Sequence, residues 1–299
     1  MSAVSPAVEC KRKNYLYIIY DLFKVKQTIL LLFVGVFGYL IAAVSNIDLF
    51  KFLLIIISLF LTIGGTTGFN MIFDADLDAI MMRTRNRVIP SGLIDRREAL
   101  IISLSALALG LYIGWGISTW FFIAGLLGFI IDIAVYTLIM KRKTWLSVVL
   151  GGFAGGMPAF GGYLAHVSSP DLYSISLMLI VALWSSPHIW YISSYYIEDY
   201  VRARIPTLPV VKGFKASVKA SMTMISLILL VVLTMFIYSN LRLWITLTVS
   251  LIMSINLLKI MYSHLISFNK ENIRRTFKFL SPYLAIIFIS LYIDRLLGF

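Results

Sequence analysis

Apolar stretches of about twenty residues recur along the whole chain, and they restrict the fold more than any other feature of the sequence. A helix of about that length crosses the hydrocarbon core of a bilayer, which is about 30 Å thick. Of the 299 residues, 60% are hydrophobic and only 13% are charged. Because a backbone inside lipid must satisfy its own hydrogen bonds, these stretches predict an all-α, polytopic transmembrane bundle.

We predict about nine transmembrane helices from this criterion. They cover residues 27–45, 50–72, 97–116, 119–140, 145–166, 173–195, 217–238, 241–263 and 278–297. Residues 1–26 are expected to form a cytoplasmic N-terminal segment, and residues 27–299 a single transmembrane domain. No short apolar segment with a small-residue cleavage site closely follows the basic N-terminus, so no signal peptide is expected. The one cysteine, Cys10, excludes an intrachain disulfide.

The basic residues lie almost entirely on one side of these spans. Only Lys51, Arg242 and Arg295, out of 26 lysines and arginines, fall on the other side. Since basic residues gather at cytoplasmic span ends, this split predicts an odd number of spans with a cytoplasmic N-terminus. It also explains most of the net charge of +12. No nucleic-acid partner is expected, because no basic stretch interleaved with aromatics stands apart from the membrane ends.

The stretch from Asn70 to Gly92 reads NMIFDADLDAIMMRTRNRVIPSG and combines acids, an amide and arginines. If residues 61–82 continue as one helix, Asn70, Asp74 and Asp78 share one face. A hard divalent cation takes carboxylate and amide oxygens, and magnesium usually shares its shell with phosphate oxygens. The arginines that follow could then grip the phosphate: Arg83, Arg85 and Arg87.

A second acidic pair, Glu198 and Asp199, lies where the apolar pattern of the sixth span ends. The two acidic stretches are predicted on the same side of the membrane, so together they could hold two cations that bridge a diphosphate. Arg87 and Lys141 would neutralise the remaining charge. The alternative for the first acidic stretch is a solvated helix end, and for Glu198 and Asp199 it is a solvated loop. For Arg83 and Arg85 the alternative is a positive-inside role alone.

Three features inside the spans are less specific. His188 falls near the middle of the sixth span, where a histidine usually faces the bundle interior, either packed and hydrogen-bonded or in contact with a substrate. Asp132 lies inside the fourth span and could be structural or line a pocket. The run GGFAGGMPAFGG at residues 151–162 predicts a bent, cavity-lining helix. No nucleophile motif or phosphate-binding glycine loop is present.

Four segments together carry a family resemblance. They read DADLDAIMMRTRNR at 74–87, YTLIMKRKT at 136–144, GGFAGGMPAFGGY at 151–163, and PH followed by EDYVRARIPTLPVVKG within 187–213. With Asn70, the first segment resembles the N-x-x-x-D-x-x-x-D motif of the UbiA superfamily of intramembrane prenyltransferases. The whole set is most similar to the heme branch of that superfamily, protoheme IX farnesyltransferase.

The chain departs from the pattern of the heme branch at three positions. Ala75 stands where arginine is usual, Val25 where proline is usual in a K-P-R segment, and Ala159 where a second proline is usual. Tyr195 occupies the place of the first acid in the second D-x-x-x-D motif of the quinone branch. This substitution leaves the pair at 198–199 as the only acids there and puts a complete second magnesium site in doubt.

The resemblance implies farnesyl transfer from farnesyl diphosphate to the vinyl group of heme B, with addition of water, giving heme O and diphosphate. The implied cofactor is Mg²⁺. The implied catalytic residues are Asp74, Asp78 and Asp199, and the implied metal ligands are these three with Asn70. The implied substrate contacts are Asn70, Arg83, Arg87, Lys141, His188 and Glu198. The resemblance also implies a multi-pass protein of the cell membrane whose active site faces the cytoplasm, with a downstream heme A synthase or terminal oxidase assembly as a further partner.

Two other functions are compatible with the same residues. One is a UbiA-type transfer to a quinone precursor or an archaeal lipid acceptor. The other is a transporter, in which Asp132 and the glycine-rich helix form part of an ion path. Loss of prenyl transfer on replacement of Asp74 would separate the enzyme from the transporter.

Overall fold

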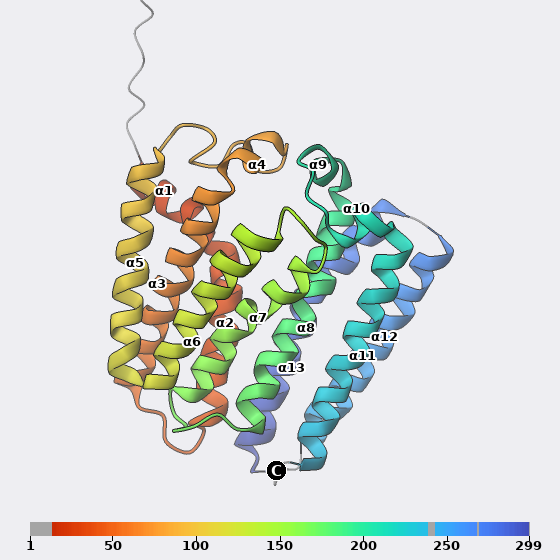
Figure 1. Cartoon of the computed structure of the whole chain (residues 1–299). Coiled ribbons are helices and arrows are strands. Elements are labelled where there is room, and N and C mark those ends of the chain that lie inside the picture. The colour runs from red at the N-terminus through yellow and green to blue at the C-terminus, as the bar shows by residue number, and fades with distance from the viewer. Residues whose placement is uncertain (1–13, 239–242, 268, 299) are drawn as a thin grey trace, which may run out of the picture.

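The computed structural model describes residues 14–238, 243–267 and 269–298 as a helical bundle without a strand in those ranges (Figure 1). The long helices are α2 (Val25–Ala42), α3 (Leu49–Phe73), α5 (Arg96–Ile117), α6 (Thr119–Ile130), α7 (Ser147–Leu164), α8 (Leu172–Tyr195), α11 (Phe214–Tyr238), α12 (Trp244–Ile266) and α13 (Lys270–Leu296). A π-helix, η1 (Ile131–Met140), continues α6. The shorter helices are α1 (Tyr15–Leu22), α4 (Ala75–Ile80), α9 (Ile197–Arg202) and α10 (Leu208–Lys212). The predicted all-α bundle is confirmed. Cys10 and the first two residues of the predicted 241–263 span lie outside the described ranges.

Eight helices in the described ranges are long and apolar enough to cross a membrane, counting α6 and η1 as one. Large apolar side chains are exposed on their outer surfaces, as at Tyr112, Trp115 and Leu230. In a soluble protein such exposure would be a liability, whereas lipid is a favourable surrounding for it. The chain is therefore a multi-pass membrane protein.

The predicted span at 145–166 corresponds to α7, which is not among these eight helices because glycines dilute its apolar character. Its glycines allow close packing in the middle of the bundle. A Cβ atom on Gly162 would lie 1.9 Å from the carbonyl oxygen of Gly35 in α2. One on Gly156 would lie 2.5 Å from the carbonyl oxygen of Met178 in α8. The glycine-rich run thus brings α2 and α8 against α7, which is the packing role that small residues take between membrane helices.

The short helices α4, α9 and α10 lie together at one end of the bundle, and the C-terminus lies at the other (Figure 1). Figure 1 also shows α7 between α6 and α8, in front of α2. The connections that contain these short helices are therefore concentrated at the α4 end. This arrangement places the acidic stretches after α3 and α8 at the same end of the molecule.

Candidate active site

A cavity of about 520 Å³ lies inside the bundle and carries most of the residues that the sequence singled out. Near the α4 end its wall is polar and charged. Deeper in the bundle the lining consists of small and apolar residues, among them Ser58, Gly110, Gly114 and Phe121. A cavity with one charged end and apolar walls suits a ligand with an anionic head and a hydrocarbon tail.

The α3–α4 junction positions the acids of the first motif, but not as one continuous helix. We expected residues 61–82 to form a single helix; instead α3 ends at Phe73, and Asp74 leaves helical geometry with φ −94° and ψ 2°. The amide of Asp74 still donates to the carbonyl of Asn70 at 3.0 Å, and that of Asp78 to Asp74 at 2.8 Å. Because this spacing survives the break, all three side chains line the cavity.

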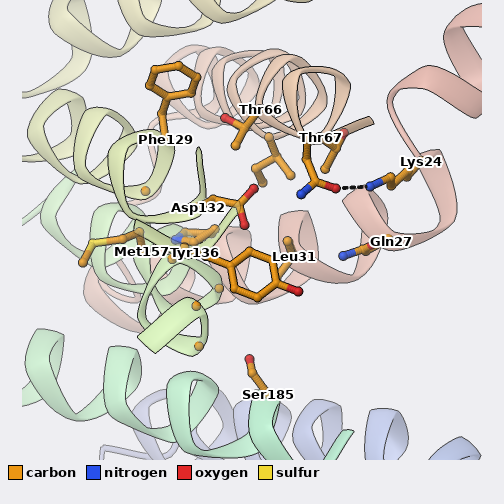
Figure 2. Close-up of a pocket in the computed structure, with 18 of the residues that line it drawn as sticks. Lys24, Gln27, Leu31, Thr66, Thr67, Phe129, Asp132, Tyr136, Met157 and Ser185 are labelled. Atoms are coloured by element: carbon orange, nitrogen blue, oxygen red, sulfur yellow. Dashed lines mark hydrogen bonds between the residues drawn. The ribbon is translucent and has the colours of Figure 1, made fainter. Parts of the chain in front are cut away.

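Each oxygen-bearing side chain of this motif is paired with a base from another segment. Lys24 Nζ donates to Asn70 Oδ1 at 2.6 Å (Figure 2), and Lys141 forms an ion pair with Asp74. Arg87 Nη1 lies 2.7 Å from an Asp78 carboxylate oxygen. Three cations and two carboxylates therefore share one end of the cavity, and the excess positive charge favours an anionic ligand.

Lys24 is a site residue that the sequence did not mark as one. It has left-handed backbone geometry, with φ 45°, immediately before α2. This turn directs its side chain into the cavity beside Asn70. Burial, together with the positive charge of Arg87, lowers the pKa of Lys24 to about 8. The available signal was its place in the lysine-rich segment at 24–26, where the resemblance had drawn attention only to Val25.

The π-helix η1 brings a row of polar side chains to the cavity. In this helix a residue lies above its fifth neighbour, and the amide of Lys141 donates to the carbonyl of Tyr136 at 2.8 Å. Thr137 Oγ1 donates to the carbonyl of Asp132 at 2.7 Å and accepts from the Asn70 amide group at 2.9 Å. Asp132 and Tyr136 project into the cavity (Figure 2). The structure thus places Asp132 in the pocket, one of its two predicted positions.

Residues of the second acidic stretch take different positions. Asp199 is buried, and its carboxylate accepts hydrogen bonds from the backbone amides of Met82 at 2.9 Å and Arg83 at 3.1 Å. It therefore holds the loop after α4 against α9. Glu198 is exposed, and neither acid is part of the cavity lining. Arg83 lies at the cavity, with its guanidinium carbon 5.6 Å from the centre of the Tyr196 ring.

His188 lies in the cavity wall formed by α8. Its ring stacks on Trp184, with the ring centres 4.7 Å apart. Trp184 is itself held by a 2.6 Å hydrogen bond from Nε1 to the carbonyl of Leu280. His188 Nδ1 is buried and has no hydrogen-bond partner among the described residues. A fixed imidazole with an unpaired ring nitrogen is suited to contact a ligand.

The first acidic motif fits a magnesium ion that shares its shell with phosphate. In the described ranges no three His, Cys, Asp or Glu side chains form a metal cage by themselves. Asp74, Asp78 and Asn70 nevertheless present oxygens to one cavity, and Asp74 Oδ1 is buried without a partner in the described part of the chain. Magnesium is commonly held by one or two carboxylates plus substrate phosphates, which matches this donor set.

Comparison with known proteins agrees with this geometry. The UbiA prenyltransferase family matches residues 31–283. A protein from Thermofilum pendens named protoheme IX farnesyltransferase is 53% identical over 202 residues, covering 68% of this chain and 71% of that protein. One of the same name from Korarchaeum cryptofilum is 38% identical over 272 residues, 91% of each chain. The structure of a UbiA homolog from Archaeoglobus fulgidus bound to GPP and Mg²⁺ has a TM-score of 0.68 at 18% identity, covers 92% of this chain and 99% of that one, and shares the fold. The chain belongs to the UbiA prenyltransferase family and is a prenyltransferase.

Proposed function

We propose that this enzyme transfers the farnesyl group of farnesyl diphosphate to the vinyl group of heme B, with addition of water, and so makes heme O. The relatives named protoheme IX farnesyltransferase support this choice of substrates. The observation that carries it is one cavity with two features. Lys24, Arg87 and Lys141 form a cationic layer at one end, and the stacked pair His188 and Trp184 lies in the wall formed by α8.

The cationic layer is the proposed site of the diphosphate. Lys24, Arg87 and Lys141 line the cavity on three different segments, and Arg83 lies on the same lining. Charge-assisted hydrogen bonds from such groups hold phosphate oxygens strongly. We propose that Asp74 and Asp78, assisted by Asn70, hold Mg²⁺. When bound, this ion would draw negative charge onto the departing diphosphate.

The walls below this layer suit an allylic cation. Phe129, Tyr136 and Trp184 line the cavity with aromatic rings, whose faces attract positive charge. Gly125 and Gly128 of α6 add small, apolar positions to the same lining. Water must stay away from the cation until the acceptor has reacted, and an apolar wall favours its exclusion.

His188 is our candidate contact for the heme. His188 lies in the cavity wall, and a histidine ring nitrogen is a common ligand of heme iron. The stacking of its ring on Trp184 fixes the direction of that nitrogen. A quinone precursor has no metal to use such a ligand, so this residue separates the two acceptor classes.

The proposed site faces the cytoplasm of the cell membrane. The short helices lie at the α4 end of the bundle, and so do most basic residues of the described ranges, for example Arg83, Lys141 and Arg202. The positive-inside rule assigns that end to the cytoplasm. A downstream heme A synthase or terminal oxidase assembly would be the natural recipient of the product.

The decisive experiment supplies the purified protein with Mg²⁺, farnesyl diphosphate and heme B. We expect a product heavier than heme B by a farnesyl group and a hydroxyl group, and its loss in Asp74→Asn and Asp78→Asn. Protein that binds farnesyl diphosphate yet gives no farnesylated heme would refute the acceptor. Parallel reactions with an aromatic acid and a glycerol phosphate lipid test the other acceptors, and His188→Ala should impair only the reaction with heme.

A further inference from the structure

We propose that Asp132 is the catalytic base that takes a proton from the water added to the acceptor. This inference rests on the proposed function and concerns its second half. Among the described residues, three carboxylates line the cavity: Asp74, Asp78 and Asp132. The first two are each held by a basic side chain, Lys141 and Arg87 respectively. Within the described residues, the carboxylate of Asp132 has neither an ion pair nor a hydrogen bond.

The position of Asp132 along η1 separates it from the diphosphate layer. Lys141, which contacts Asp74, lies nine residues further along the same chain segment, about two turns of the helix. Thr137 lies between these two levels and contacts Asn70. Asp132 is therefore deeper in the cavity, below the groups proposed to hold phosphate. That depth is where the reacting carbon of a prenyl diphosphate would lie when its head is bound above.

The surroundings of Asp132 are suited to a carboxylate that accepts a proton. Figure 2 shows its carboxylate among the residues that line the cavity, with Thr66 and Thr67 on one side and Tyr136 on the other. The hydroxyl of Thr66 donates to the carbonyl of Thr62 at 2.8 Å. Thr67 donates to the carbonyl of Phe23 at 2.9 Å. Because both hydroxyls already donate to backbone carbonyls, they leave the Asp132 carboxylate free to accept a hydrogen bond from water.

An unpaired carboxylate inside a membrane protein is costly, and its retention at a cavity wall points to a function. The π-helix contributes to this placement of the carboxylate. An α-helix in this segment would not bring residues five apart into line, whereas η1 aligns Asp132 with Thr137 and Tyr136 with Lys141. Of these four residues, Asp132, Tyr136 and Lys141 line the cavity. Irregular helices of this kind are frequent at functional sites.

In the proposed reaction, farnesyl transfer forms a cation on the acceptor, and water then adds to that cation. The bond between farnesyl C1 and the diphosphate oxygen breaks, and its electron pair leaves with the diphosphate. The π electrons of the vinyl group form the new carbon–carbon bond to C1, which leaves positive charge on the vinyl carbon next to the porphyrin ring. A water oxygen gives a lone pair to that carbon. One proton of this water passes to a carboxylate oxygen of Asp132, and the hydroxyl group remains on the product.

The test measures products of Asp132→Asn in the reaction with farnesyl diphosphate, heme B and Mg²⁺. Without the base, we expect the cation to lose a proton from its neighbouring carbon, giving an unsaturated product that is lighter than heme O by one water. The rate of heme O formation should fall by about 10²–10⁴-fold, the usual contribution of a general base. Thr66→Val is the matched control, because it changes the same wall without touching a carboxylate, and it should keep the wild-type ratio of the two products.

A second variant keeps the proposal testable if Asp132→Asn is poorly folded. Asp132→Ala leaves space for a small carboxylate, and added formate should restore heme O relative to the unsaturated product. Asp132→Asn that makes heme O at the wild-type rate and ratio would overturn the proposal. So would Asp132→Ala in which both products fall together and formate restores neither. Wild-type protein that farnesylates no heme would instead refute the proposed function, so the two failures are distinct.

Discussion

The guanidinium of Arg87 donates a 2.7 Å hydrogen bond to the carboxylate of Asp78, nine residues before it, and the pair lies on the cavity wall. Lys141, which directly follows η1, forms an ion pair with Asp74 in the same way. Each carboxylate that is proposed to hold Mg²⁺ is thus paired with a cation that is proposed to hold phosphate. When the metal diphosphate binds, the carboxylates would turn to the metal and the cations to the phosphate. No buried charge would then be left without a partner, and an unpaired buried charge is what costs most.

Replacing Arg87 tests this exchange. Arg87→Gln removes a charge-assisted hydrogen bond worth about 1.5–3 kcal/mol, so we expect kcat/KM for farnesyl diphosphate to fall by roughly 10–100-fold. Arg87→Lys keeps the charge but loses the planar guanidinium group, so its kcat/KM should lie between those of the wild type and Arg87→Gln. Arg85→Gln is the matched control, because Arg85 is exposed and is not part of the cavity lining. Equal losses in the Arg85 and Arg87 variants would contradict a specific role for the ion pair.

Asp199 has two possible roles that differ in their response to magnesium. Its hydrogen bonds to the amides of Met82 and Arg83 predict that Asp199→Ala loosens the loop after α4. We expect a stability loss of about 1–3 kcal/mol and reduced turnover, with the half-saturating Mg²⁺ concentration unchanged. Glu198→Gln is the control, since Glu198 is the neighbour of Asp199 in sequence and its side chain is exposed. A large increase in the Mg²⁺ requirement of Asp199→Ala would instead support the sequence-based expectation that Asp199 is a metal ligand.

The glycines of α7 provide a test of the packing. A Cβ atom at Gly162 would meet a backbone oxygen of Gly35 at 1.9 Å, and a backbone atom in a packed helix cannot move aside easily. We expect Gly162→Ala to destabilise the protein by about 1–3 kcal/mol or more. Gly116→Ala on α5 has nothing within 4 Å of the added atom and should be neutral or slightly stabilising. Thermal unfolding in detergent measures both variants, and an unchanged midpoint for Gly162→Ala would show that α2 and α7 are not packed this closely.

The sequence predicted the spans and the first acidic motif because both depend on local pattern. Apolar length alone defines a membrane helix, and the spacing of Asn70, Asp74 and Asp78 keeps them together even across a helix break. Two other features depend on tertiary structure and carry little local signal. The π-helix is one, since its register places Asp132 in the cavity. The other is the left-handed turn at Lys24, which brings a residue 46 positions away in sequence to Asn70.

The pH dependence of substrate binding tests the role of Lys24. Burial, together with the charge of Arg87, lowers its pKa to about 8 in the free enzyme. The protonated amine attracts the diphosphate and the neutral amine does not, so the affinity for farnesyl diphosphate should be highest below pH 8 and fall as the pH rises through that value. A bound anion stabilises the protonated form, so the amine should lose its proton at a higher pH in the complex than in the free enzyme. Arg stays charged throughout this range, and Lys24→Arg should bind with little change between pH 7 and pH 9. Equilibrium binding of farnesyl diphosphate at a series of pH values distinguishes these curves, and a wild-type curve as flat as that of Lys24→Arg would exclude Lys24 from the diphosphate site.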